Sequence, residues 1–124
     1  MKKILIYLAI TFLISCKMDK ANCRKYFAGK WKYEQYAPET AYVIRTLDKQ
    51  IEYVENGKYH YDFDIKWLSD CSYQLIYKGT NSSTPAKAKI GETTIVEIVD
   101  IEATEMKYHT KFRNLEEVGK MTKL

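Results

Sequence analysis

The stretch Tyr59-His60-Tyr61-Asp62-Phe63-Asp64-Ile65-Lys66-Trp67 decides the fold class of this chain. Its five apolar side chains stand at every second position, with polar residues between them, which places the apolar set on one face of a β-strand. A helix would scatter the same residues around its circumference. Just upstream, Asn56-Gly57 favours a tight hairpin, because both residues accept a positive φ. This region therefore predicts an antiparallel hairpin with one apolar face.

The same two-residue period continues on both sides of this strand. A single helical turn is predicted over Asn22–Ala28, ended by Gly29, and no other window shows a helical period. Thr93–Ile101 is apolar on both faces and is therefore predicted to be the most buried strand. About eight antiparallel strands joined by short turns predict an all-β domain, either an up-and-down barrel or a strongly curved sheet. The further strands are predicted over 30–34, 42–47, 50–55, 73–78, 105–112 and 116–122.

The amino-terminal residues predict an export signal. Lys2 and Lys3 precede Ile4–Ser15, twelve residues without a charge. A membrane-spanning helix needs about 20 apolar residues, so this segment fits a secretory signal helix better than a permanent anchor. Leu13-Ile14-Ser15-Cys16 resembles the bacterial lipobox, whose cysteine is acylated after cleavage. The alternative is an ordinary signal peptide, but an A-x-A-like cleavage site is absent.

The chain is accordingly divided into three parts. Residues 1–15 are expected to be a lipoprotein signal peptide, residues 16–22 the lipidated Cys16 and a polar tether, and residues 23–124 a single β domain. Cys16 would carry diacylglycerol and palmitate, and several acyl chains suffice for stable membrane attachment. We therefore expect a cell-envelope protein anchored in a bacterial membrane, the outer membrane in particular, facing the periplasm or the surface.

Charge and motifs exclude several function classes. Removal of residues 1–15 takes away two of the 20 Lys and Arg residues and leaves 18 against 16 acidic residues, a formal charge of +2 in place of +4. Such a balance gives no basis for nucleic-acid binding, which needs clustered basic residues. No nucleotide-binding glycine loop, zinc-type Cys/His pattern or serine nucleophile motif is present. We expect no enzymatic activity and no cofactor.

Two cysteines remain beside Cys16. Cys23 and Cys71 form an even number in an oxidising compartment, which favours a disulfide that ties the start of the domain to its middle. The alternatives are two buried free thiols or a reactive cysteine. Neither cysteine has a Cys-x-x-Cys partner or a histidine nearby in the sequence, so redox chemistry is disfavoured.

Two resemblances follow from these motifs. Gly29-Lys30-Trp31 resembles the Gly-x-Trp start of lipocalin-like barrels. Cys23-Arg24-Lys25-Tyr26-Phe27 and the block Lys66-Trp67-Leu68-Ser69-Asp70-Cys71-Ser72-Tyr73 resemble small, uncharacterised lipoproteins of Bacteroidota. Some members of that group are described as DNA topoisomerase IV, but an acylated envelope domain of this size cannot reach the chromosome. The resemblance implies a location and a lipocalin-like fold, and it transfers no catalytic residue.

The aromatic side chains are the candidate binding residues. Seventeen aromatic residues, eleven of them tyrosines, can line a barrel interior and offer apolar area with hydroxyl groups to a small amphipathic ligand. The alternative is that they only fill the core. The candidate set is Trp31, Tyr33, Tyr59, Tyr61, Phe63, Trp67, Tyr73 and Tyr77. The sequence predicts a non-catalytic binding or accessory module; the alternative is a protein-interaction module, either an outer-membrane assembly accessory or a hydrolase inhibitor.

A polar set shares the other face of the central strand. His60, Asp62 and Asp64, completed by His109, have the donor types of a divalent-cation site, and Asp62 with Asp64 could serve as an acid–base pair. The opposing interpretation is a solvated strand face, where alternating polar residues are expected. That interpretation is preferred, so we assign no metal site and no catalytic residue.

Overall fold

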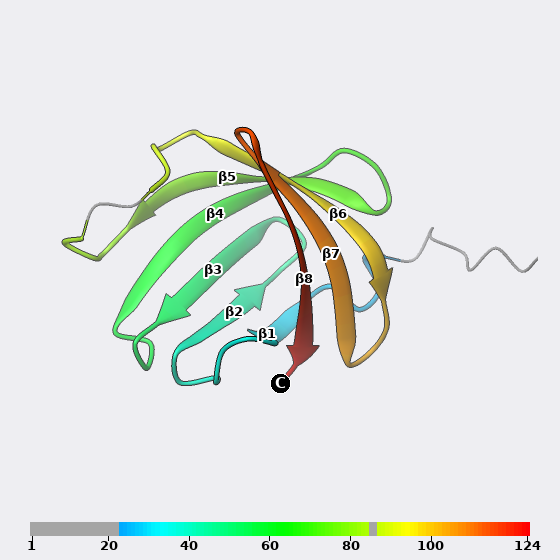
Figure 1. Cartoon of the computed structure of the whole chain (residues 1–124), viewed down its shortest axis with the longest axis horizontal. Coiled ribbons are helices and arrows are strands. Elements are labelled where there is room, and N and C mark those ends of the chain that lie inside the picture. Colours follow the sequence, from blue (N-terminus) through cyan, green and yellow to red (C-terminus); the bar gives the residue numbers. More distant parts are fainter. Residues whose placement is uncertain (1–22, 85–86) are drawn as a thin grey trace, which may run out of the picture.

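Eight antiparallel strands, each hydrogen-bonded to the next, wrap into a closed barrel (Figure 1). The computed structural model describes residues 23–84 and 87–124. Closure is made by β1 and β8, where Trp31 lies opposite Lys123 and Tyr33 opposite Met121. The predicted all-β up-and-down barrel is confirmed. The strands are β1 (Gly29–Tyr33), β2 (Ala41–Arg45), β3 (Lys49–Val54), β4 (Tyr59–Trp67), β5 (Ser72–Thr80), β6 (Thr93–Ile101), β7 (Glu105–Phe112) and β8 (Leu115–Lys123).

Alternation along the strands fills the barrel interior. In β4 the apolar residues Phe63, Ile65 and Trp67 lie opposite inward residues of β3 and β5, whereas the residues between them face outward. The hairpin that leads into β4 is the predicted one, with Asn56 at φ 57° and Gly57 at φ 79°. The buried core is formed by Cys23, Phe27, Trp31, Val43, Ile65, Tyr73, Val96, Ile98, Met106 and Met121.

The two ends of the barrel differ. At one end, called here the closed end, residues 23–28 lie beside loops 46–48, 68–71 and 102–104. Phe27 is fully buried there, with its ring 4.9 Å from that of Trp67 and 5.1 Å from that of Tyr73. Trp31 Nε1 donates a hydrogen bond of 2.9 Å to the Phe27 carbonyl. The opposite end, called here the open end, is bordered by loops 34–40, 55–58 and 113–114 and by the described residues 81–84 and 87–92.

A disulfide holds this plug. Cys23 and Cys71 are bonded, with their Cα atoms 5.3 Å apart, and 48 positions separate them in the sequence. The bond ties the segment before β1 to the loop between β4 and β5. The predicted pairing is confirmed.

Two sequence expectations are wrong. β6 is not the most buried strand, because Ile95 and Val99 face outward with 42% and 54% of their surface exposed. A strand in a closed barrel has only one covered face, so an apolar residue on the other face meets solvent. Cys23–Phe27 forms turns instead of a helix, and the Phe27 amide bonds to the Arg24 carbonyl at 3.3 Å.

The predicted signal helix, Cys16 and the tether lie outside the described residues. Within 23–84 and 87–124, no helix has the length and apolar character required to cross a bilayer.

Candidate functional site

The open end gives solvent access to the barrel interior. Tyr33, Glu52, Tyr61 and Tyr108 occupy inward positions of four strands, yet each is only partly buried. In a barrel closed by hydrogen bonds, solvent reaches inward side chains through an end. These four residues therefore border a mouth at the open end, with aromatic walls and one carboxyl group.

A buried arginine lies below the mouth. Arg45, the last residue of β2, is only 5% exposed and points inward. Its Nε donates to Gln50 Oε1 at 2.9 Å, and its two Nη atoms lie 3.3 and 3.1 Å from the sulfur atoms of Met106 and Met121. Its guanidinium carbon lies 4.8 Å from the Phe27 ring centroid. The plug thus forms part of the arginine's surroundings.

The hydrogen-bond acceptors around Arg45 are weak for a buried cation. A guanidinium has five N–H donors, and only Gln50 offers an oxygen acceptor here. Methionine sulfur is a weak acceptor, and no carboxylate of the described chain lies within 4.0 Å of the guanidinium. Buried charges are normally paired with an opposite charge. Arg45 therefore retains hydrogen-bonding capacity.

Phenols and one carboxyl group lie within electrostatic reach of Arg45. Burial raises the pKa of Glu52, while the Tyr33 hydroxyl and the Arg45 charge act in the opposite direction. Burial raises the pKa of Tyr108 to about 12 and also raises the pKa values of Tyr33 and Tyr73. All four groups are disfavoured as anions by the barrel interior.

Tyr73 is the most informative of these residues. The residue is completely buried, and its hydroxyl has no hydrogen-bond partner within the described part of the chain. A buried hydroxyl without a partner costs about 1–3 kcal/mol. Together with Arg45, Glu52, Tyr33 and Tyr108, it forms what we call the interior polar cluster. This cluster offers hydrogen-bond donors and a positive charge beneath an aromatic mouth.

The eight aromatic residues singled out from the sequence all lie at inward positions, but they do not form one site. Tyr33, Tyr59, Tyr61 and Phe63 lie toward the open end, and Tyr77 is buried behind them. Trp31, Trp67 and Tyr73 pack toward the closed end, where Phe27 contacts the last two.

Sequence reasoning missed Arg45 and Glu52. Arg45 follows Val43 by two positions in a strand, and Glu52 follows Gln50 in the same way. That spacing is a signal for an inward position once the strand's covered face is known.

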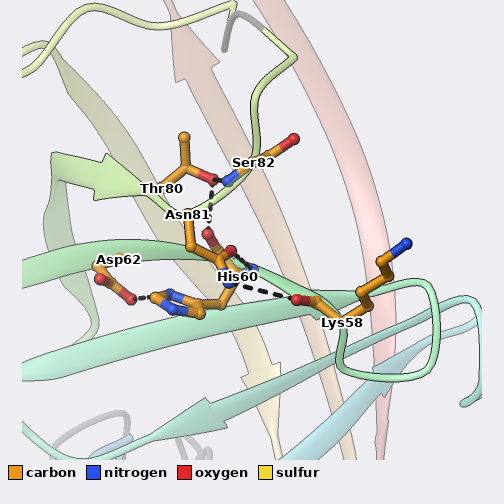
Figure 2. A network of polar contacts seen from close by, with 6 residues as sticks. All are labelled: Lys58, His60, Asp62, Thr80, Asn81 and Ser82. Carbon is orange, nitrogen blue, oxygen red and sulfur yellow. Dashed lines mark hydrogen bonds and ion pairs between the residues drawn. The ribbon is translucent and has the colours of Figure 1, made fainter.

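The polar face of β4 lies outside the barrel (Figure 2). His60 Nδ1 lies 2.9 Å from Asp62 Oδ1, and the His60 amide donates to Asn81 Oδ1 at 2.8 Å. The Thr80 hydroxyl donates to the His60 carbonyl at 2.7 Å. The Asn81 side-chain amide donates to the Lys58 carbonyl at 3.3 Å. These bonds join the start of β4 to the end of β5 and to Asn81 after it, so the network has a structural role.

The polar residues considered for a metal are not assembled into a cation site. Asp64 pairs with Lys78 at 3.5 Å instead of joining His60 and Asp62, and His109 lies 3.9 Å from Glu116 on another side of the barrel. Across residues 23–84 and 87–124, no group of three or more His, Cys, Asp or Glu side chains is arranged to hold a metal ion.

Comparison with known proteins gives no relative on which to base an identity: no family model, no curated protein and no solved structure matches this chain.

Proposed function

We propose that this chain is a lipid-anchored lipoprotein of the bacterial cell envelope and acts as a non-catalytic binding module. Its ligand is a small amphipathic molecule that enters through the open end of the barrel. The observation that carries the proposal is the buried Tyr73 hydroxyl, which has no hydrogen-bond partner within the described residues. It lies within electrostatic reach of the Arg45 guanidinium, whose acceptors are one amide oxygen and two methionine sulfurs.

The interior polar cluster favours a ligand with an anionic or strongly accepting group. Such a group would accept hydrogen bonds from Tyr73 and Arg45 and replace the methionine sulfurs as acceptors. The apolar part of the ligand would lie against Tyr33, Tyr61 and Tyr108 in the mouth. A carboxylate- or phosphate-bearing amphiphile has both features.

The test uses a dansyl-labelled fatty acid as the probe and follows its fluorescence on titration with the full-length mature protein. Tyr73→Phe removes only the hydroxyl, and Arg45→Met replaces the cation with an apolar side chain of similar length. Each variant is expected to weaken probe binding about tenfold, the size of one hydrogen bond to a charged group. Tyr53→Phe is the matched control, because Tyr53 stacks on Tyr42 at the outer surface of the barrel.

Tyr73→Phe is also expected to preserve stability, because the hydroxyl it removes has no partner to lose. Weaker binding by this variant would therefore not reflect unfolding. Absence of probe binding by the wild type, or equal binding by wild type and both interior variants, would overturn the ligand proposal.

The anchor has its own test. Cys16→Ser removes the thiol that acylation requires, so the variant is expected in the soluble envelope fraction and not with membranes. Persistent membrane association of this variant would contradict the lipoprotein assignment.

A protein-interaction role is the second candidate, and one observation favours it. Ile95, Val99 and Val118 face outward, and Val118 is 83% exposed. Exposed apolar side chains on a strand face can mark a contact surface for another protein. The test is cross-linking in intact cells from a photoreactive residue placed at position 95 or 118. Capture of a partner protein there, together with no probe binding inside the barrel, would favour this role over ligand binding.

A further inference from the structure

Two neighbouring loops at the closed end expose leucine side chains. Leu47, in the loop between β2 and β3, is 48% exposed, and Leu68, in the loop between β4 and β5, is 49% exposed. Both lie at the barrel end opposite the mouth. They add little to the core, because about half of each side chain faces solvent.

A tryptophan and an arginine join these leucines into one surface. Trp67 Nε1 donates a hydrogen bond of 2.8 Å to the Leu47 carbonyl, which holds the two loops side by side. The Arg24 guanidinium lies 4.5 Å from the Trp67 ring centroid and donates to the Ser69 carbonyl at 3.3 Å. We call Arg24, Leu47, Trp67 and Leu68 the closed-end patch.

The composition of this patch suits a membrane interface. Tryptophan combines a large apolar ring with a polar N–H group and is enriched at the headgroup level of bilayers. Arginine keeps its charge near lipid phosphates while its stem covers apolar surface. Leucines on loop tips can enter the upper acyl region without unfolding a strand.

The closed-end patch also lies next to Cys23, the first described residue, which follows the proposed acylation site Cys16 in the sequence. Cys23 is fixed to Cys71 in the loop that carries Leu68. Cys16 precedes Cys23 by seven residues, a stretch that spans at most about 25 Å even when fully extended. A lipid on Cys16 therefore keeps the closed end near the bilayer.

The charge on the neighbouring part of the closed end indicates which side approaches the lipid. The loop between β6 and β7 and the strand ends beside it carry Asp100, Glu102 and Glu105. Glu105 is paired with Lys120 at 3.0 Å, but Glu102 is exposed. The Leu47 and Leu68 loops carry one exposed carboxylate each, Asp48 and Asp70, next to the Arg24 guanidinium. They are therefore the less acidic side of the closed end and the one that approaches anionic headgroups.

We propose that the closed-end patch docks on the phospholipid surface, so that the barrel lies on the membrane with its mouth turned away from it. This inference rests on the acylation of Cys16 that is part of the proposed function. Docking makes the barrel's orientation fixed, whereas a lipid tether alone leaves it free to tumble. A ligand then reaches the mouth from the aqueous side.

The two tryptophans provide a direct measurement. The acylated protein is reconstituted into vesicles of phosphatidylcholine with a minor share of phosphatidylglycerol, with lipids brominated near the headgroup end of the acyl chain. Trp67 lies in the patch, whereas Trp31 is fully buried in the barrel. Brominated lipid is expected to quench the Trp67 emission, and Trp67→Phe, which retains only Trp31, is expected to lose this quenching.

A double variant tests the leucines. Leu47→Ser with Leu68→Ser is expected to lower the docking equilibrium constant about tenfold and to reduce the quenching accordingly. The matched control is Leu115→Ser with Val118→Ser, which removes two exposed apolar side chains toward the open end. This control is expected to be quenched like the wild type.

Vesicle flotation separates the two proposals. Protein that floats with vesicles but shows no quenching, or shows equal quenching in the leucine variant, would overturn docking while the anchor stands. Protein that does not float at all would overturn the anchor, and the docking inference with it.

Discussion

Removal of the Cys23–Cys71 disulfide tests how the closed end of the barrel is held. The perturbation is the double substitution Cys23→Ala with Cys71→Ala, which deletes the bond and leaves no free thiol at either position. The Phe27 plug and the Trp67 side chain lie next to this bond, so the segment before β1 loses its covalent link to the rest of the barrel.

The expected loss of folding stability follows from the length of the loop that the disulfide closes. A cross-link between residues 48 positions apart removes chain entropy from the unfolded state worth about 4 kcal/mol at room temperature. For a domain of about 100 residues, a loss of that size corresponds to a fall in the midpoint of thermal unfolding of about 20 °C. This is a large share of the roughly 5–15 kcal/mol by which a typical domain is stable.

The assay is urea unfolding, followed by circular dichroism, of the disulfide-bonded protein and the alanine variant. The native spectra are expected to be similar, since the hydrogen-bonded closure between β1 and β8 does not involve either cysteine. A rise in the denaturant m-value is expected as well, because the unfolded chain without its cross-link exposes more surface. A loss of stability below about 1 kcal/mol would refute the reasoning from loop entropy.

Three further predictions concern single side chains. Burial raises the pKa of Glu52 above its ordinary value of 4.5, so its carboxyl group favours folding at acid pH and this contribution is lost as the pH rises through the raised pKa. Glu52→Gln should therefore raise the free energy of unfolding at pH 7 relative to the wild type, and the advantage should vanish below pH 4.5 in urea titrations. A Cβ at Gly119 would lie closer than 3.0 Å to the Tyr108 ring and hydroxyl, so Gly119→Ala should cost about 1–3 kcal/mol by the same measurement, and an unchanged value would contradict the observed packing. The hydrogen-bonded ion pair with Arg113 and the hydrogen bond from the Lys89 amide lower the pKa of Glu92 to about 2. Carboxyl NMR titration should find that value in the wild type and a higher one in Arg113→Gln, still below the ordinary 4.5 because the Lys89 amide remains.

The alternation of apolar and polar residues predicted the strands well, because it depends only on the residues within each strand. The predicted Tyr59–Trp67, Thr93–Ile101 and Glu105–Phe112 agree with β4, β6 and β7. Closure is different, because it depends on the pairing of β1 with β8 at opposite ends of the domain. No local pattern encodes that pairing, so a barrel and a curved sheet remained equal alternatives in the sequence.

The exposure of β6 shows a second limit of prediction from the sequence pattern. Alternation indicates which residues share a face, but a strand that is apolar on both faces leaves open whether a second layer covers it. In this barrel nothing among the described elements covers the outer side of Ile95 and Val99.

The sequence predicted only part of the candidate site. Aromatic residues such as Tyr61 and Tyr77 were placed on the inward face correctly, since aromatic side chains favour that face of a strand. Arg45 and Glu52 were not, because a charged residue in a strand is normally assigned to the solvent side. Their inward orientation follows from their register, Arg45 beside Gln50 and Glu52 beside Tyr61, which only the fold establishes.

A buried guanidinium contributes little to the folding of a small barrel. Taking a cation out of water costs several kcal/mol, and the ring of Phe27 and two methionine sulfurs compensate less well than a carboxylate would. Burial also pushes the nearby Glu52 carboxyl toward its neutral form, which leaves the Arg45 charge less opposed. The interior therefore presents the Arg45 guanidinium, whose hydrogen-bonding capacity is incompletely used, to anything that enters by the mouth. The disulfide-held plug packs against Arg45 through the Phe27 ring, so the closed end of the barrel helps to hold the guanidinium in place.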